Sequence, residues 1–269
     1  MSAPVITFLS DYGLEDDFVG VCHGVMASIC PQARVIDITH GLARHDVLAG
    51  ALVLRNTLPY MPAGVHLAVV DPDVGAERRA VALRLGDGRF LVGPDNGLLS
   101  LAAAGGEGIV EAADIGGSSF RLAPVSATFH GRDIFAPVAA HLAAGASLAD
   151  AGVPLDPAAL VTIAPPVPVR DEDGLVAHVI YVDHFGNVQL DVGHEDLADS
   201  GLQLGHRVGL RYDSGTAEAR FARTFADVGT GELLIYEDAY RALAIAVSSG
   251  DAAARLELAP GDELRIRPA

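Results

Sequence analysis

Short apolar runs of strand length alternate with segments of helical spacing over the first half of the chain. VITFLS, which begins at Val5, RVIDIT (34–39) and VHLAVV (65–70) are rich in β-branched residues and are typical of buried strands. Between them, residues 17–30 and 45–61 place apolar side chains three and four positions apart, as a helix does. This alternation predicts an α/β domain with a mostly parallel sheet and helices on both faces.

The stretch 65–81, VHLAVVDPDVGAERRAV, is the centre of the predicted sheet. Its apolar run stops at Asp71, a loop of Pro, Asp and Gly follows, and Arg78 and Arg79 close the loop. Ligands of α/β sheets bind at the loops beyond the carboxyl ends of the strands. A carboxylate and a guanidinium in such a loop therefore indicate a candidate site, although an Asp-Pro turn with surface charges is an equal explanation at this point.

Other polar residues follow predicted strands or precede a predicted helix. Asp11 comes directly after the first strand, Asp95 lies in the loop Gly-Pro-Asp-Asn-Gly, and His130 precedes a helix expected within 127–145. Because the carboxyl ends of parallel strands meet at one edge of a sheet, we expect these three residues to lie near Asp71.

Each candidate also has an ordinary structural explanation when it is taken alone. Asp11 can cap the helix that follows it, and His130 can be a histidine that merely precedes a helix. Arg78 can pair with Glu77 or Asp73 on the surface. The joint pattern at several strand ends favours a site over these separate explanations.

The second half of the chain has a different pattern. Residues 152–170 hold five prolines and show no clear period, which predicts a boundary between an N-terminal domain over 1–165 and a C-terminal domain over 170–269. Beyond it, short strand-like runs are separated by turn residues. This pattern is typical of a small all-β barrel or sandwich.

Charge and composition exclude several functions. The net charge of −17 repels phosphate backbones, so we expect no nucleic-acid partner. All 18 basic residues are arginine, which excludes Schiff-base lysines, pyridoxal-phosphate attachment and the phosphate-loop lysine. The glycine-rich dinucleotide, Gly-x-Ser-x-Gly and His-Glu-x-x-His patterns do not occur in the sequence.

Compartment and membrane contact can also be predicted. The apolar runs are interrupted well short of a membrane span, and no basic segment of a signal peptide precedes the first strand. Cys22 and Cys30 fall about two turns apart on one predicted helix, too far for a disulfide. We therefore expect a reduced, cytoplasmic protein with no membrane partner.

One short resemblance concerns the central loop. Asp71-Pro72-Asp73-Val74 after an apolar strand resembles the signature of haloacid-dehalogenase-type phosphohydrolases, in which the first Asp is a nucleophile beside magnesium. That chemistry commonly uses a lysine on the phosphate, which this sequence lacks. A magnesium-dependent phosphohydrolase is thus one alternative function.

A longer resemblance covers nearly the whole chain through six segments in a fixed order. They are TFLSDYGLEDDFVG, VVDPDVGAERRAV, VGPDNGLLS, TFHGRDIFAP, YVDHFGNVQL and AIAVSSGDAA. Together they resemble the S-adenosyl-L-methionine hydroxide adenosyltransferases (SAM hydrolases), relatives of fluorinating and chlorinating enzymes. The resemblance implies that water attacks C5′ of S-adenosylmethionine to give adenosine and L-methionine, without a cofactor or a metal. It also implies a homotrimer with each site between one subunit's N-terminal domain and a neighbour's C-terminal domain.

The resemblance assigns roles in the N-terminal domain. Asp71, Arg78 and His130 match the residues that flank the reacting water, and they are the predicted catalytic residues. Asp11 matches a ribose-binding aspartate, and Asp16 matches an acidic residue near the methionine amine. The halogenating relatives lack this Asp and His pair, so hydrolysis is favoured over halogenation.

The resemblance also places substrate-binding residues in the C-terminal domain, with one departure from the family pattern. Phe185 and Asn187 match residues around the adenosine, with Asp183 beside them. The stretch 236–241, which contributes Asp238 and Tyr240, carries Ala where the family has Ser and Arg where it has Gly. This departure motivates a second alternative, an adenosine or S-adenosylmethionine sensor with little turnover.

Overall fold

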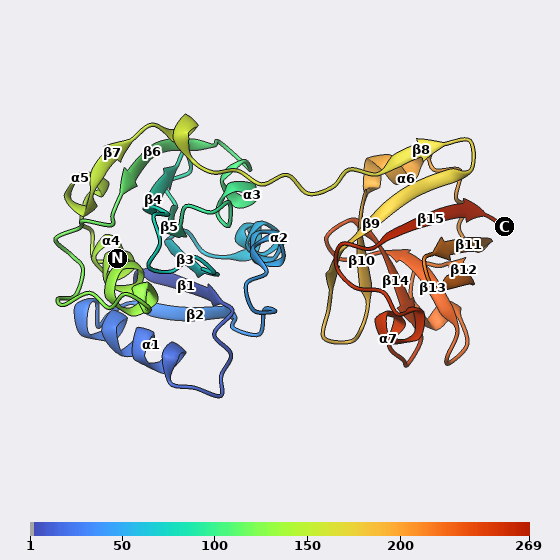
Figure 1. Ribbon diagram of the computed structural model, residues 1–269, viewed down its shortest axis with the longest axis horizontal. Coiled ribbons are helices and arrows are strands. Elements are labelled where there is room, and N and C mark those ends of the chain that lie inside the picture. The colour runs from blue at the N-terminus through green and yellow to red at the C-terminus, as the bar shows by residue number, and fades with distance from the viewer. Residues whose placement is uncertain (1–2) are drawn as a thin grey trace. The chain divides into compact units, whose positions relative to one another are not determined.

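The computed structural model describes residues 3–269 and divides the chain into two compact units, Met1–Ala164 and Pro165–Ala269 (Figure 1). The division falls inside the proline-rich stretch 152–170. Each unit has a hydrophobic core of its own.

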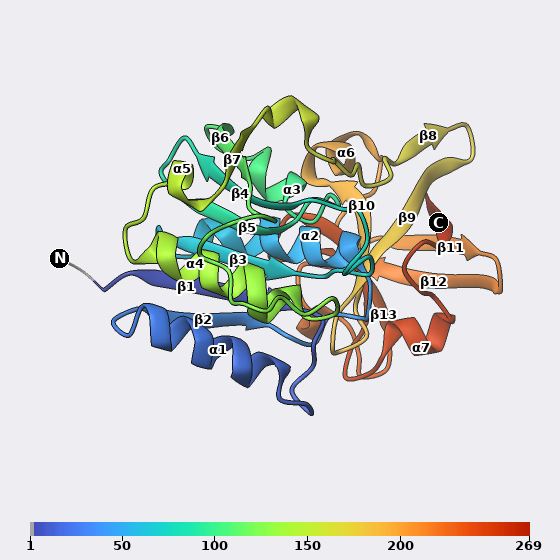
Figure 2. The ribbon, with the colours of Figure 1, turned by 60° about the vertical axis from the view of Figure 1, so that its left-hand side comes forward.

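The N-terminal unit is built on a seven-stranded sheet. Its strands are β1 (Val5–Ser10), β2 (Arg34–Thr39), β3 (Val65–Val69), β4 (Ala80–Leu85), β5 (Phe90–Pro94), β6 (Ile109–Asp114) and β7 (Val153–Leu155). Their order in the sheet is β2-β1-β3-β5-β4-β6-β7, and Figure 2 shows β1, β2 and β3 side by side. The half formed by β2, β1, β3 and β5 is parallel, whereas β4, β6 and β7 pair in antiparallel fashion.

Helices cover both faces of this sheet. They are α1 (Phe18–Ile29), α2 (Val47–Thr57), α3 (Ser100–Ala103), α4 (Ala136–Ala143) and α5 (Leu148–Ala151). The pair α1 and α4 packs on one face, and the pair α2 and α3 packs on the other (Figure 1). Helix α2 begins where Asp46 Oδ1 accepts a hydrogen bond from the amide of Ala49 at 2.8 Å, which satisfies one of the free donors of its first turn.

The core of this unit forms because the strands of its parallel half carry apolar residues on both faces. All five residues of β3 are buried, as expected for a strand covered by helices on both sides. Phe8 from β1, Leu67 from β3 and Phe135 from the segment before α4 are fully buried in the core.

Strand direction gathers polar residues at one edge of the sheet. Asp11 and Asp71 follow the parallel strands β1 and β3. Strand β4 runs against β5, with Ala80 opposite Pro94, so it begins at the edge where β5 ends. Arg78 precedes β4 and therefore starts from this same edge.

The C-terminal unit is all-β apart from short helices. Its strands are β8 (Val169–Asp171), β9 (Gly174–Val182), β10 (Val188–Gly193), β11 (Arg207–Tyr212), β12 (Gly215–Phe221), β13 (Leu233–Glu237), β14 (Ala242–Val247) and β15 (Glu263–Pro268). Its helices are α6 (His194–Asp199) and α7 (Ala252–Leu256). The strand order is β10-β14-β13-β12-β11-β15-β9-β8, and pairing of β9 with β10 closes the first seven into a barrel.

The predicted fold class is confirmed: an α/β unit is followed by a smaller barrel of strands. Cys22 and Cys30 are both buried and free, as their spacing predicted. Within residues 3–269, no helix combines the length and the apolar character that crossing a membrane requires.

Shortening of a buried side chain in the central strand β3 should destabilise the N-terminal unit. Leu67→Ala removes a fully buried side chain, so we expect the free energy of unfolding to fall by about 2–5 kcal/mol. Guanidinium denaturation followed by circular dichroism measures this change. Leu14→Ala is the matched control because Leu14 is 75% exposed, and its effect should stay within about 0.5 kcal/mol. Equal effects of the two variants would contradict the assigned core.

Candidate functional site

Arg78 joins the three predicted catalytic residues by direct hydrogen bonds. Its Nε donates to Asp71 Oδ1 at 2.8 Å, and its Nη2 donates to Asp71 Oδ2. The same Nη2 donates to His130 Nδ1 at 2.8 Å. Residues that lie as far as 59 positions apart in the numbering thus meet in one cluster, which we call the Asp71–Arg78–His130 triad.

The ion pair at the centre of the triad is withdrawn from water. The side chains of Arg78 and Asp71 are only 8% and 6% exposed. The Arg78 guanidinium also lies over the ring of Phe135, 5.2 Å from its centroid. A two-point guanidinium–carboxylate contact fixes orientation as well as position, so Asp71 is held rigidly at the end of β3.

The position of Arg78 determines the protonation of His130. A guanidinium has only donors, so Nδ1 of His130 must accept and the ring proton resides on Nε2. Burial lowers the pKa of His130, and the positive charge of Arg78 lowers it further, against opposing effects of Asp71 and Asp133. His130 is therefore a neutral imidazole, and within residues 3–269 its Nε2–H donor has no hydrogen-bond partner.

An aromatic wall stands beside the triad. The ring of Tyr12 packs against Phe18 and Phe129 with centroid distances of 5.8 and 5.9 Å. At Gly131, which directly follows His130, a Cβ would lie 2.1 Å from Tyr12 Oη. Burial and nearby negative groups raise the pKa of Tyr12 well above its usual range. Sequence reasoning missed Tyr12, although an aromatic residue directly after a strand-end aspartate was a signal.

Asp11 is fixed by a second loop. Its Oδ2 accepts a hydrogen bond from the backbone amide of His45 at 2.9 Å. It does not cap α1, because Asp17 occupies the N-cap position of that helix. Asp16 is exposed on the same loop. No hydrogen bond between the described residues joins Asp11 or Asp16 to His130 or its two partners.

Asp95 has a structural role at the same edge. Its Oδ2 accepts from Arg79 Nε at 2.8 Å, and its Oδ1 accepts from the amide of Val161 at 2.8 Å. Asp95 therefore holds the segment around Val161. The two neighbouring arginines consequently bind different carboxylates, and Arg78 does not form a surface pair with Glu77 or Asp73.

The same geometry disfavours the phosphohydrolase alternative. Arg78 places a positive charge against both oxygens of Asp71, and this charge would repel a magnesium ion bound to the same carboxylate. Within residues 3–269, Asp71, Asp73 and His130 do not bring their ligand atoms together into a possible metal cluster.

In the C-terminal unit, Asp183 organises the turn between β9 and β10. Its Oδ1 accepts from the amides of Phe185 and Asn187 at 2.8 and 2.9 Å, and its Oδ2 accepts from Asn187 Nδ2 at 2.7 Å. The backbone carbonyl of Gly186 accepts from the first amides of α7. This turn presents the ring of Phe185, which is 74% exposed.

Asp238 organises a second turn in the same way. Its Oδ1 accepts from the amides of Tyr240 and Ala242 at 2.8 and 3.0 Å, and its Oδ2 accepts from Gln189 Nε2 at 2.9 Å. Arg241, where the family pattern has glycine, adopts a φ of 63°. The backbone at this position thus keeps the left-handed conformation that glycine favours.

The two turns border one cavity of about 670 Å³. All five substrate-binding residues predicted in this unit line it: Asp183, Phe185, Asn187, Asp238 and Tyr240. Sequence reasoning missed five further polar or aromatic lining residues, which are Tyr181, Gln189, Phe225, Tyr236 and Ser249. Three of them, Tyr181, Gln189 and Tyr236, lie in strands, where alternation of side chains between the two faces was the available signal.

The cavity has the character of a site for a flat, mostly apolar group. The rings of Phe225 and Tyr236 lie 5.1 Å apart. Burial raises the pKa of Tyr236 to about 12, and the charges of Asp183 and Asp238 act in the same direction. Aromatic surfaces with a few fixed polar groups are typical of pockets that hold a heterocyclic ring.

Known proteins resemble this chain over nearly its full length. The chain is 50% identical over 268 residues to the (R)-S-adenosyl-L-methionine hydrolase of Salinispora arenicola (strain CNS-205), with 98% of each chain covered. It is 31% identical over 270 residues to a fluorinase of Actinoplanes sp. (strain N902-109), with 90% of each covered. A crystal structure of an uncharacterized conserved protein from Thermotoga maritima superposes with a TM-score of 0.89 at 37% identity, covering 97% of this chain and 99% of that one.

Family models match both units. The SAM hydroxide adenosyltransferase N-terminal domain matches residues 6–152, and the C-terminal domain of the same family matches residues 177–265. These matches include the triad in the first unit and both turns of the cavity in the second. The chain therefore belongs to the SAM hydroxide adenosyltransferase family.

Proposed function

We propose that this protein hydrolyses S-adenosyl-L-methionine by attack of water at C5′, giving adenosine and L-methionine. The observation that carries the proposal is the Asp71–Arg78–His130 triad, with its fixed carboxylate and its free imidazole donor. The relatives that are named (R)-S-adenosyl-L-methionine hydrolases support the same reaction and preference for the R configuration at sulfur.

The reaction depends more on the position of the attacking water than on acid catalysis. The O–C5′ bond forms while the C5′–S bond breaks, and its electron pair returns to sulfur. Because the sulfonium leaves as a neutral thioether, no general acid is needed at the leaving group. Holding one water in line with C5′ then removes a large part of the barrier.

The triad can hold and activate that water. The Nε2–H of His130 donates to the water oxygen, while a carboxylate lone pair of Asp71 not used by Arg78 accepts a water proton. Both contacts orient the water, and the proton that it loses on attack passes toward Asp71. Arg78 is a positioning residue, since it holds the other two side chains and touches neither water nor substrate in this scheme.

The substrate is bound by the remaining predicted residues. The adenine occupies the cavity between Phe185 and the second turn, with Asn187 beside it. Asp11 binds the ribose hydroxyls, and Asp16 faces the methionine amine. The carboxylate of Asp238 already accepts three hydrogen bonds, so its contribution is to shape the turn that presents Tyr240.

We further propose a cytoplasmic homotrimer in which each site combines the N-terminal unit of one subunit with the C-terminal unit of its neighbour. The family resemblance supports this assembly. The triad lies in one unit and the cavity lies in the other, so a complete site needs one unit of each kind. The reaction uses no cofactor or metal, and neither nucleic acid nor a membrane takes part.

Isotope labelling tests the reaction. Incubation with S-adenosylmethionine in H₂¹⁸O should give adenosine and methionine in equal amounts, with the label in the 5′-hydroxyl of adenosine. Asp71→Asn should lower kcat by about 10²–10⁴-fold, because the acceptor for the water proton is lost. Asp73→Asn is the matched control on the same loop and should retain activity.

Chromatography and mass spectrometry measure these outcomes. Tight ligand binding without adenosine formation would instead identify the sensor. Phosphatase activity that EDTA abolishes would identify the phosphohydrolase. Label in methionine, or loss of activity in both variants alike, would refute the assigned mechanism.

Mixed trimers test the shared site. Asp71→Asn disables the N-terminal half of a site, and Asn187→Ala disables the C-terminal half, so each variant alone should have little activity. Co-expression of the two should restore about a third of the wild-type activity in the mixed trimers, since every ring that contains both variants has one site of three with two intact halves. Purification through two different tags selects the mixed assemblies. Absence of any recovery in a verified mixed trimer would show that each chain builds its own site.

The charge on Arg78 should control the pKa of His130. Arg78→Gln should raise that pKa toward its ordinary value, because a positive neighbour is lost and Asp71 then favours the imidazolium. NMR titration of the His130 ring measures the shift. Arg79→Gln, which removes a charge that pairs with Asp95 instead, should leave the pKa unchanged. An unchanged pKa in the Arg78 variant would contradict the proposed arrangement.

A further inference from the structure

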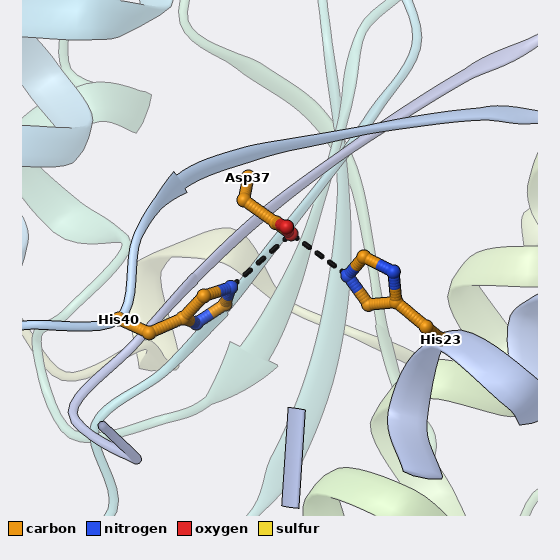
Figure 3. Close-up of side chains that lie close together, drawn as sticks. All are labelled: His23, Asp37 and His40. Atoms are coloured by element: carbon orange, nitrogen blue, oxygen red, sulfur yellow. Dashed lines mark hydrogen bonds and ion pairs between the residues drawn. The ribbon is translucent and has the colours of Figure 1, made fainter. Parts of the chain in front are cut away.

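Two histidines and one aspartate meet outside the proposed site. His23 comes from α1, Asp37 from β2, and His40 follows β2 (Figure 3). Asp37 Oδ1 lies 2.8 Å from His23 Nε2 and 3.1 Å from His40 Nε2. Within residues 3–269, these are the residues of the His, Cys, Asp and Glu types whose ligand atoms gather within 4.8 Å of one another. We call them the His23–Asp37–His40 cluster.

One nitrogen of the cluster is buried without a hydrogen bond. The side chain of His40 is 2% exposed, and its Nδ1 is 2.7 Å from Ser10 Oγ. Its Nε2 points toward Asp37 but forms no hydrogen bond with any residue that the structure describes. A buried polar atom without a partner is costly, so this nitrogen is suited to a ligand that the protein itself does not supply.

We propose that the His23–Asp37–His40 cluster binds a divalent transition-metal ion of the zinc type. Two imidazole nitrogens and one carboxylate form the three-ligand set that proteins use for such ions, with water in a fourth position. Calcium and magnesium prefer oxygen ligands in larger number, so the two histidines select against them.

The geometry needs only a small adjustment to accept the ion. Ligands about 2.0–2.1 Å from a tetrahedral zinc lie somewhat more than 3 Å apart, whereas Asp37 now lies 2.8 and 3.1 Å from the two nitrogens. The side chains of Asp37 and His23 are 42% and 35% exposed, which lets them move apart and lets the ion enter. Ser10, by contrast, orients the buried His40 as an outer-shell partner does.

Binding there would stiffen the loop that carries Asp11. Ser10 Oγ, besides contacting His40, accepts from the amide of Tyr12 at 3.3 Å. The backbone carbonyl of His40 accepts from the amide of Gly13 at 2.8 Å. An ion on His40 therefore links α1 and β2 to this loop. None of the triad residues belongs to the cluster, so the proposed reaction proceeds without the ion.

Titration calorimetry with zinc chloride tests the site. The probe is added to untagged, full-length protein that has been freed of metal with a chelator. We expect one zinc ion per chain, and His23→Gln and Asp37→Asn should each weaken binding by about tenfold or more. Both substitutions fall on partly exposed side chains, so the variants should fold. His206→Gln replaces an exposed histidine of the other unit and should bind zinc as the wild type does.

Two further readouts separate the site from adventitious binding. Cobalt(II) should give the visible absorption of a tetrahedral ion in the wild type, and His23→Gln should lose it. Zinc should raise the thermal midpoint by several degrees, about 5 °C at saturation, in the wild type and the His206 variant alone. Failure of zinc to bind, or equal affinity of wild type and His23→Gln, would overturn the proposal. So would magnesium binding as tight as zinc binding.

Discussion

The arrangement of the N-terminal unit depends on the buried contact of Arg78 with Asp71 and His130. Two charges withdrawn from water are tolerated only when their geometry is good and each is paired. The sheet provides that geometry: β3 ends and the antiparallel strand β4 begins at the same edge. The loop between them therefore folds back and places guanidinium against carboxylate. Removal of either partner would leave an uncompensated charge beneath the loop.

The same contact determines what His130 can do. Because guanidinium donates to Nδ1, the ring cannot use that nitrogen as a base, and Nε2 carries the proton. In the proposed mechanism, proton acceptance is then left to the carboxylate of Asp71, and the imidazole orients the water as a donor. One positively charged residue thus separates the two roles of donor and acceptor, which a freely rotating histidine would mix.

Much of this arrangement follows from the sequence, because strand ends are visible as apolar runs that stop at a polar residue. That reasoning placed Asp71 and His130 correctly at one edge. Strand ends alone could not decide which of the adjacent residues Arg78 and Arg79 binds Asp71, because their directions depend on how the chain enters β4; the family resemblance assigned Arg78. Alternation along the strand could assign Gln189 to one face of β10 but not to the cavity, since its place beside the second turn depends on pairing with Ala244 of β14, a strand far away in the sequence.

At residues 236–241 the sequence departs from the family pattern, whereas the structure keeps the backbone turn. The departure motivated the alternative of a sensor with little turnover, yet Asp238 still accepts from the amides of Tyr240 and Ala242. Arg241 pays about 1–2 kcal/mol for its left-handed backbone, while its exposed guanidinium contacts Glu237 at 3.3 Å. The backbone of the turn is therefore retained, and the change is confined to the side chains that it displays. In the proposed function, loss of the serine hydroxyl at Ala239 consequently bears on affinity for the methionine end of the substrate.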